Sequence, residues 1–248
     1  MISAVCPIKN EEDFLPIHIE NLIDKVDEII YCDTGCEDKS IEIIQHYQSL
    51  YPNKIKLVEW KISEAYKWEE GKVRQHIVKH AKNNFILITD ADEVLSDNFS
   101  VEIMKQSIEG KLVSFRFLPF WKNLKTLRCN AKGDLHWYPN PIYRIFDRRS
   151  YTYKEEGGNH SFLKPNNGKS EVIDMPSINL LHLHYGLFKR CKPNDNRLGD
   201  LNLLDYWQKN VLPDSIPDIN FDFLPDNGHP FNTIPYTGEY PKCLNPYL

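Results

Sequence analysis

Several features that would assign a function at once are absent from the 248-residue sequence. No apolar run approaches the ~20 residues that a membrane-spanning helix needs, so we expect no transmembrane segment. The net charge is -5, from 30 Lys and Arg against 35 Asp and Glu, which argues against a nucleic-acid partner bound through its phosphates. The six cysteines form no C-x-x-C pair, and in a chain this long they do not indicate a disulfide framework.

The N-terminus also lacks the basic and apolar regions of a secretory signal. Together with the cysteine usage, this predicts a cytoplasmic protein, either free or peripheral at the inner face of the membrane. Three enzyme fingerprints are missing as well: G-x-x-x-x-G-K-S/T, G-x-G-x-x-G and G-x-S-x-G. NTPase and classical dehydrogenase functions therefore lose support.

What is present is an alternation of apolar runs and amphipathic helical patterns. Strands are predicted at residues 2–8, 28–32, 55–59, 85–89, 112–118 and 177–185, and helices at residues 14–26, 41–50 and 69–83. The β-α-β order of the first half predicts an α/β architecture, a mostly parallel, Rossmann-like sheet flanked by helices. We expect one catalytic domain over residues 1–205 and an irregular, Pro-rich extension over residues 206–248 that packs on it.

Polar clusters follow three of the predicted strands, at residues 9–13, 33–35 and 90–93. Ligands of parallel sheets bind beyond the carboxyl ends of the strands, so these clusters predict one site at a shared edge. Asp90 and Asp92 form the sharpest motif, because two carboxylates just past a buried strand are costly unless a cation neutralises them. Mg2+ or Mn2+ on a pyrophosphate would do so. The alternative is a solvated acidic turn.

Other candidate residues carry weaker signals. His182 and His184 stand two apart on a predicted strand, so both imidazoles face one side, either as ligands of metal and phosphate or as structural histidines. Asp33 either accepts a hydrogen bond from a ligand or forms an Asx turn. Arg74 either contacts phosphate or belongs to a solvated helix face.

These motifs, in this order, resemble a known enzyme family. The segments CPIKNEEDFL, DEIIYCDTGCEDKSIEII and FILITDADEV are similar to those of family 2 glycosyltransferases with the GT-A fold, of the lipopolysaccharide-core and capsule type. The resemblance is strongest over residues 2–95, where it includes the spacing from Trp68 to Arg74. It extends to the YRIF segment at residues 143–146 and to the HLHY strand.

The resemblance implies a role for each matching residue. The nucleotide pocket would be lined by Pro7, Lys9, Asn10, Glu11, Asp33, Arg74 and Asp90. A divalent metal, Mn2+ or Mg2+, would be held on the diphosphate by Asp92, with His182 and His184 as late ligands of the metal or the diphosphate. Asp90-Ala91-Asp92 would then be the family's D-x-D motif.

The sequence departs from the family where relatives carry an acidic residue. Many relatives have V-H-E after the R-L-F segment, whereas this chain has N-H-S at residues 159–161. A transfer with inversion needs a carboxylate within reach of the acceptor hydroxyl. Glu156 is therefore the predicted catalytic base, with Glu155 and Asp134 as alternatives.

The function implied by the resemblance is metal-dependent glycosyl transfer in polysaccharide synthesis. A sugar would move from a nucleotide-sugar donor to a hydroxyl of a glycan or lipid-linked acceptor, with inversion. Two alternatives stay open. A nucleotidyltransferase would need the same metal and diphosphate pocket, and a degenerate, non-catalytic nucleotide-sugar binding protein would explain the missing acid.

Overall fold

The computed structural model describes residues 1–60, 70–121, 123–130, 135, 142–153, 163–185, 187 and 231–248. The chain divides into two compact units. Unit 1 comprises Met1–Arg116, Pro141–Leu180 and Tyr240–Tyr247, and unit 2 comprises Phe117–Asn140, Leu181–Glu239 and Leu248. Strands β6 (Leu112–Trp121) and β11 (Val172–Tyr185) begin in unit 1 and end in unit 2.

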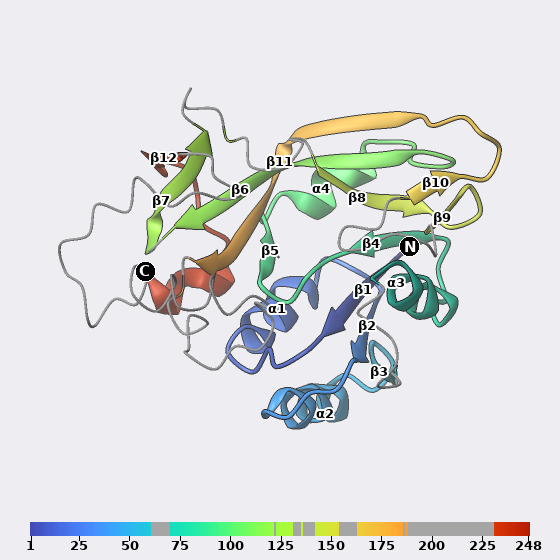
Figure 1. The fold of residues 1–248 in the computed structure, drawn as a ribbon, viewed down its shortest axis with the longest axis horizontal. Helices are drawn as coiled ribbons and strands as arrows, with labels where there is room; N and C mark the ends of the chain where they lie inside the picture. The colour runs from blue at the N-terminus through green and yellow to red at the C-terminus, as the bar shows by residue number, and fades with distance from the viewer. Residues whose placement is uncertain are drawn as a thin grey trace. The chain divides into compact units, whose positions relative to one another are not determined.

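The parallel half of unit 1 follows the order that the sequence predicts (Figure 1). Strands β1 (Ile2–Ile8), β2 (Glu28–Asp33), β3 (Ile55–Glu59) and β4 (Phe85–Ile88) pair in parallel, in the order β4-β1-β2-β3. The helices between them are α1 (Leu15–Leu22), α2 (Ser40–Leu50) and α3 (Glu70–Lys79). The predicted α/β class and mostly parallel sheet are confirmed.

Continuous apolar runs explain why these strands form and where the helices lie, because a parallel sheet covered by helices is buried on both faces. Val5 of β1 and Ile30 of β2 are register partners, and both pack with Val73 and Ile77 of α3 in one buried cluster. Burying each such side chain contributes roughly 1.5–3 kcal/mol. The buried sheet therefore fixes the positions of the loops that follow its strands.

Helix α1 ends earlier than the helical pattern predicts. It stops at Leu22, and the backbone N–H groups of Lys25 and Val26 both donate to the Leu22 carbonyl, at 2.9 and 3.2 Å. Val26 is nevertheless buried. The apolar pattern continues because the turn after the helix packs against the core.

The other half of unit 1 is antiparallel. Strand β8 (Ile142–Asp147) pairs with β4, and residues 112–115 of β6 pair with β8. The shorter elements are β5 (Glu93–Leu95), α4 (Phe99–Met104), β9 (Tyr151–Tyr153) and β10 (Leu163–Pro165). Strand β8 thus lies directly beside β4, the strand whose end carries the acidic motif.

The described part of unit 2 is an antiparallel sheet. Strand β7 (Asn123–Asn130) pairs with the end of β6, where the register shifts between Phe120 and Trp121, and with β12 (Phe231–Pro235). In unit 1, the C-terminal residues form a 3-10 helix, η4 (Lys242–Tyr247), with Leu244 buried. Residues 206–230 lie outside the described residues, so the irregular extension and the boundary at residue 205 remain predictions.

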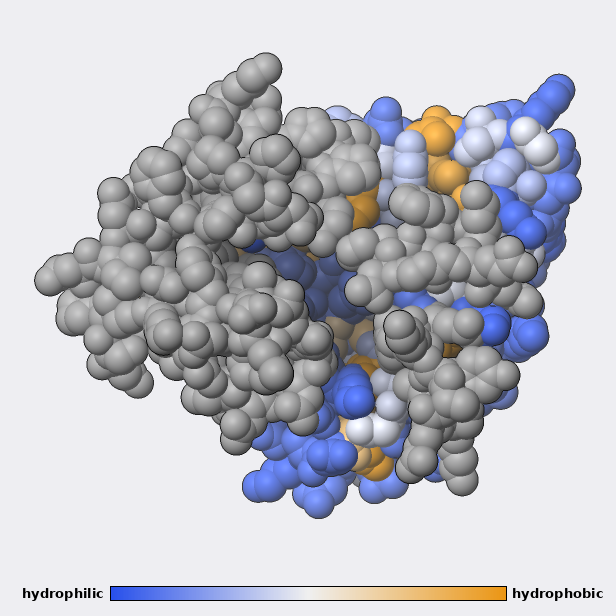
Figure 2. All heavy atoms as spheres, viewed as in Figure 1, coloured by the Kyte–Doolittle hydropathy of each residue, from blue (hydrophilic) through white to orange (hydrophobic). Residues whose placement is uncertain are grey.

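The described surface in Figure 2 is mostly hydrophilic, with smaller hydrophobic patches between the hydrophilic residues. Within the described residues, the helices are too short or too polar to cross a bilayer.

Candidate functional site

The loops that follow β1 and β2 are tied together by hydrogen bonds. Asn10 adopts a left-handed backbone with φ 57°, which asparagine tolerates better than most residues. Its side-chain oxygen accepts from the Glu37 N–H at 2.8 Å, and the Glu11 N–H donates to Ser40 Oγ at 2.7 Å. Hydrogen bonds therefore join the predicted polar clusters after β1 and β2 into one edge of unit 1, which we call the braced edge.

The predicted pocket residues at and just after the end of β1 differ in exposure. Pro7 pairs with Cys32 of β2 and is half-buried, whereas Lys9 is exposed and Glu11 is buried. The end of the strand is thus followed by an exposed cation and a buried carboxyl group.

Asp33 forms the Asx turn that the sequence left as an alternative. Its Oδ1 accepts from the N–H groups of Gly35 at 2.9 Å and Cys36 at 2.8 Å. Gly35 has φ 104°, a backbone conformation that favours glycine. The local sequence therefore fixes the orientation of the Asp33 carboxylate.

The acidic motif forms a tight turn between β4 and β5. The Glu93 N–H donates to the Asp90 carbonyl at 3.0 Å, and Glu93 Oε2 accepts from the Asp90 N–H, also at 3.0 Å. Ala91, Asp92 and Glu93 are all buried. The turn is thus closed on itself rather than solvated.

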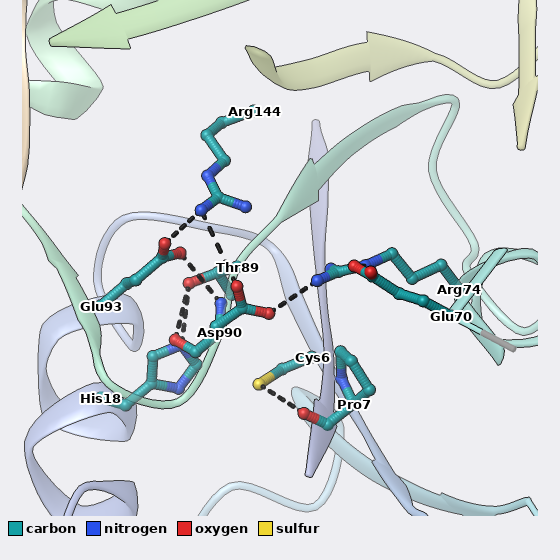
Figure 3. Close-up of polar contacts among 9 residues, drawn as sticks. All are labelled: Cys6, Pro7, His18, Glu70, Arg74, Thr89, Asp90, Glu93 and Arg144. Atoms are coloured by element: carbon teal, nitrogen blue, oxygen red, sulfur yellow. Dashed lines mark hydrogen bonds and ion pairs between the residues drawn. The ribbon is translucent and has the colours of Figure 1, made fainter. Parts of the chain in front are cut away.

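Two arginines hold the Asp90 carboxylate from different elements (Figure 3). Arg74 of α3 donates from Nη2 to Asp90 Oδ1 at 2.8 Å and from Nε to Glu70 at 2.6 Å. Arg144 of β8 lies 3.8 Å from Asp90 Oδ2 and donates to the Glu93 carboxylate. Sequence reasoning found Arg74 but assigned no role to Arg144 or Glu93.

These contacts set the charge state of the turn. Burial alone would raise the pKa of Asp90, but Arg74 and Arg144 hold it below its ordinary value. Burial raises the pKa of Glu93 above its ordinary value, with Asp90 and Asp92 adding to the shift and Arg144 opposing it. Asp90 is therefore the carboxylate that the surrounding charges keep ionised.

A buried histidine supports the same turn from the other side of the sheet. His18 of α1 contacts Tyr31 Oη through Nδ1 at 2.8 Å and Thr89 Oγ1 through Nε2 at 3.1 Å. The Thr89 hydroxyl donates to the Asp90 carbonyl at 3.2 Å, so Nε2 carries the proton and Nδ1 accepts from Tyr31. Burial lowers the pKa of His18 to about 4, against the opposing charges of Asp92 and Asp90.

Sequence reasoning missed His18, although a signal was present. The residue lies four positions after Phe14 and four before Leu22, in the apolar stripe of α1. A polar side chain in such a stripe needs a buried partner. Its partners, Tyr31 and Thr89, belong to different strands, and only the folded chain shows them.

His182 and His184 stack on β11 in unit 2. Their ring centroids are 5.6 Å apart with the planes 10° from parallel, and Phe117 lies 5.2 Å from the His182 ring. The two imidazoles therefore share one face, as the i, i+2 spacing predicts. Both are half-buried.

Several predicted residues lie outside the described ranges. They are Trp68, Asp134, Glu155 and Glu156, and with them the N-H-S segment at residues 159–161. The predicted catalytic base is among them, so its position stays a prediction.

The motifs at the strand ends match those of a known protein family. The sequence model described as "Glycosyl transferase family 2" matches residues 3–161. The chain belongs to glycosyl transferase family 2. The match spans β1 to β9 and thus the acidic turn and both arginines, and it confirms the family that the motifs resemble.

Individual relatives of this family 2 chain are distant. A poly(ribitol-phosphate) beta-glucosyltransferase of Bacillus spizizenii is 30% identical over 123 residues, covering 45% of this chain and 19% of the relative. The mannosyltransferase PcManGT of Pyrobaculum calidifontis, solved with GDP-Man and Mn2+, has a TM-score of 0.50 and 13% identity, over 73% of this chain and 56% of that one. TarS 1–349 of S. aureus has a TM-score of 0.44 and 16% identity, over 62% and 50%. The chain spans only about a fifth of the curated relative's length.

Proposed function

We propose that this chain transfers a sugar from a nucleotide-sugar donor to an acceptor hydroxyl, with a divalent metal, in glycan or polysaccharide synthesis. One observation carries the proposal: Arg74 and Arg144 hold the Asp90 carboxylate at the carboxyl end of a parallel strand in a family 2 chain. Ligands of such sheets bind at this edge.

The nucleotide pocket that we propose lies along the braced edge of unit 1. Pro7, Lys9, Asn10 and Glu11 supply one side of it and Asp33 supplies the other, with Asp90 at the ribose. Arg74 contributes by holding Asp90, because its Nε and Nη2 are occupied by Glu70 and Asp90. A rigid pocket lowers the conformational cost of binding.

The side chains that we propose as metal ligands fit a divalent metal. Asp92 offers a buried carboxylate, and we propose that His182 and His184 complete the coordination. A mixed set of carboxylate and imidazole ligands suits Mn2+ better than Mg2+, which prefers oxygen. When bound, the metal would offset the charge that develops on the leaving diphosphate. The mannosyltransferase of similar fold was solved with Mn2+.

The chain must also take a proton from the acceptor hydroxyl. We propose Glu156 for this step, with Glu155 and Asp134 as fallbacks. The carboxylate would accept the proton as the hydroxyl oxygen attacks the anomeric carbon and the nucleoside diphosphate leaves, with inversion. The extension over residues 206–248 is proposed to shape the acceptor side.

A second candidate is a non-catalytic nucleotide-sugar binding protein. The observation that favours it is Ser161, which stands where many relatives carry the acid. A serine cannot act as a base without a partner. Such a protein would bind nucleotide and metal without turnover.

Release of nucleoside diphosphate from a panel of nucleotide-sugars tests the proposal. The native chain should release nucleoside diphosphate from one donor with Mn2+ but not with a chelator, and Asp92→Asn should lose this activity. Asp24→Asn changes an exposed aspartate beyond α1 and should behave as the native chain. Release of inorganic diphosphate from a nucleoside triphosphate and a sugar 1-phosphate, assayed in parallel, would instead indicate a nucleotidyltransferase. Metal-dependent binding without turnover would indicate the non-catalytic protein.

A further inference from the structure

Five side chains, alternately acidic and basic, form a continuous network around the acidic turn. We call Glu70, Arg74, Asp90, Arg144 and Glu93 the charge clamp. Its ion pairs run in that order, with N···O separations of 2.6 Å between Arg74 and Glu70, 2.8 Å between Arg74 and Asp90, and 3.8 Å between Arg144 and Asp90. Arg144 and Glu93 close the end of the network.

The fold brings the charge clamp together from distant parts of the sequence. Strand β8 runs antiparallel to β4, with Ile145 opposite Leu87. This register brings Arg144 level with the end of β4, where the acidic turn begins. Helix α3 supplies Arg74 on the other side of Asp90 (Figure 3). The carboxylate is therefore held from two directions.

Exposure singles out one member of the charge clamp. The Asp90 side chain is 38% exposed, whereas those of Arg74 and Arg144 are each 8% exposed. Glu70 is 14% exposed and Glu93 is 1% exposed. Four largely buried side chains thus hold one accessible carboxylate in place. This arrangement is typical of a carboxylate that binds a ligand, whereas in a buried salt bridge both partners are inaccessible.

The charge clamp also leaves donors unused. Arg74 Nη1 and Arg144 Nε are buried and have no hydrogen-bond partner among the described residues. A buried unpaired donor is costly, and well-packed apolar residues are often at least as stable as buried ion pairs. Stability alone therefore does not account for the charge clamp.

The geometry points to Arg144 and Glu93 as positioning residues that orient Asp90 toward the nucleotide-sugar donor. Arg144 attracts the Oδ2 side of the carboxylate while Arg74 holds Oδ1. Glu93 fixes Arg144 and accepts from the Asp90 N–H, so side chain and backbone are held together. This assignment rests on the proposed function, because it needs a ligand at Asp90.

Calorimetric titration of the full chain with UDP, GDP, CDP, ADP and TDP, each with Mn2+, tests the assignment. For the nucleotide that the native chain binds, Arg144→Met and Glu93→Gln should each raise Kd by about 10- to 100-fold, as is usual for residues that orient a ligand-binding group. Arg144→Lys should recover part of the loss. The double variant should lose less than the product of the two, because both changes act on Asp90. Arg149→Met removes an arginine near the end of β8 that pairs with Asp147 and Glu109, and its Kd should equal the native value.

Each outcome separates the assignment from the function beneath it. A purely structural role would lower the melting temperature but leave the Kd of the folded protein unchanged, and Kd values within twofold of native for Arg144→Met and Glu93→Gln would overturn the assignment. Glu93→Gln preserves side-chain volume and carries the test if Arg144→Met fails to fold. A native chain that binds none of the five nucleotides would overturn the proposed function, and the assignment with it.

Discussion

Asp33, the last residue of β2, and Asp90, just past the end of β4, lie at the same edge of the sheet, but different groups surround them. The Asp33 carboxylate accepts from two backbone N–H groups within three residues of its own position. The Asp90 carboxylate is held by Arg74, 16 residues earlier, and by Arg144 of a neighbouring strand. One orientation is set by local sequence and the other by tertiary structure. The comparison teaches that the same residue type at the same sheet edge can depend on the fold to very different degrees.

The proposed base, Glu156, adds a third carboxylate to this comparison. A catalytic base takes part in the chemical step and should contribute little to nucleotide binding. Glu156→Gln should lower kcat by about 10²- to 10⁴-fold, the usual contribution of general base catalysis, with nucleotide Kd nearly unchanged. Kinetics with an active donor and acceptor pair, alongside Glu155→Gln and Asp134→Asn, measure this. If none of the three variants loses more than a few fold, the base lies elsewhere or the chain is not an inverting transferase.

Removing Arg74 from the charge clamp should destabilise the fold, because it leaves the largely buried Glu70 and the partly exposed Asp90 without their donor. Arg74→Met keeps an unbranched apolar side chain but removes the donor of Asp90 and Glu70. Breaking a fully buried pair costs about 3–5 kcal/mol, but Asp90 is partly exposed, so we expect a smaller loss of about 1–3 kcal/mol. Urea denaturation at neutral pH would measure this loss. Arg116→Met, at an exposed arginine of β6, is the control and should stay close to native. Equal midpoints and slopes for the two variants would show that the Asp90 network adds little to stability.

The two carboxylates also show what sequence reasoning predicts well. The order of strands and helices, the family and the acidic motif were predictable because each rests on local pattern: apolar runs in β1, β2 and β4, and polar residues directly after them. The Asx turn at Asp33 was foreseen as an alternative for the same reason. The end of α1 shows where local pattern misleads. Val26 is apolar and buried, but it lies in the turn after the helix and not in the helix itself.

The rest depends on pairings between distant residues. Arg144 lies in a stretch rich in aromatic and basic residues, and only its antiparallel pairing with β4 brings it to Asp90. His18 looks like one polar residue in an apolar helix until Tyr31 and Thr89 close around it. No periodicity in a single sequence encodes these contacts, because each joins side chains that are far apart in the chain.

The pH dependence of the free energy of unfolding tests the support that the buried His18 gives to the acidic turn. Burial depresses the pKa of His18 to about 4, whereas an unfolded histidine titrates near ~6.5. Between these values the unfolded chain binds a proton that the folded chain does not, so stability is full above about pH 6.5 and falls as the pH drops toward about 4. The shift corresponds to an upper limit of about 3 kcal/mol. Urea denaturation from pH 4 to 7 should show a shallower fall for His18→Phe than for the native chain, and parallel curves would contradict the neutral buried state.

The smallest effect is expected at Asp33, where the turn and the proposed ligand contact use the same side chain. In Asp33→Asn the side-chain oxygen can still accept from Gly35 and Cys36, so the Asx turn survives. Stability should change by less than about 0.5 kcal/mol, as for most surface substitutions.

With that oxygen retained in the turn, the other position becomes an NH2 group. A donor then faces the base donor that the native carboxylate would accept from. Losing one such hydrogen bond should raise the Kd for the nucleoside diphosphate by roughly fivefold. Titration of Asp33→Asn with Mn2+, beside Asp24→Asn as the control, measures this. An unchanged Kd would leave Asp33 as a turn residue alone, whereas a loss as large as that of Arg144→Met would show that the two carboxylates contribute alike, despite their different surroundings.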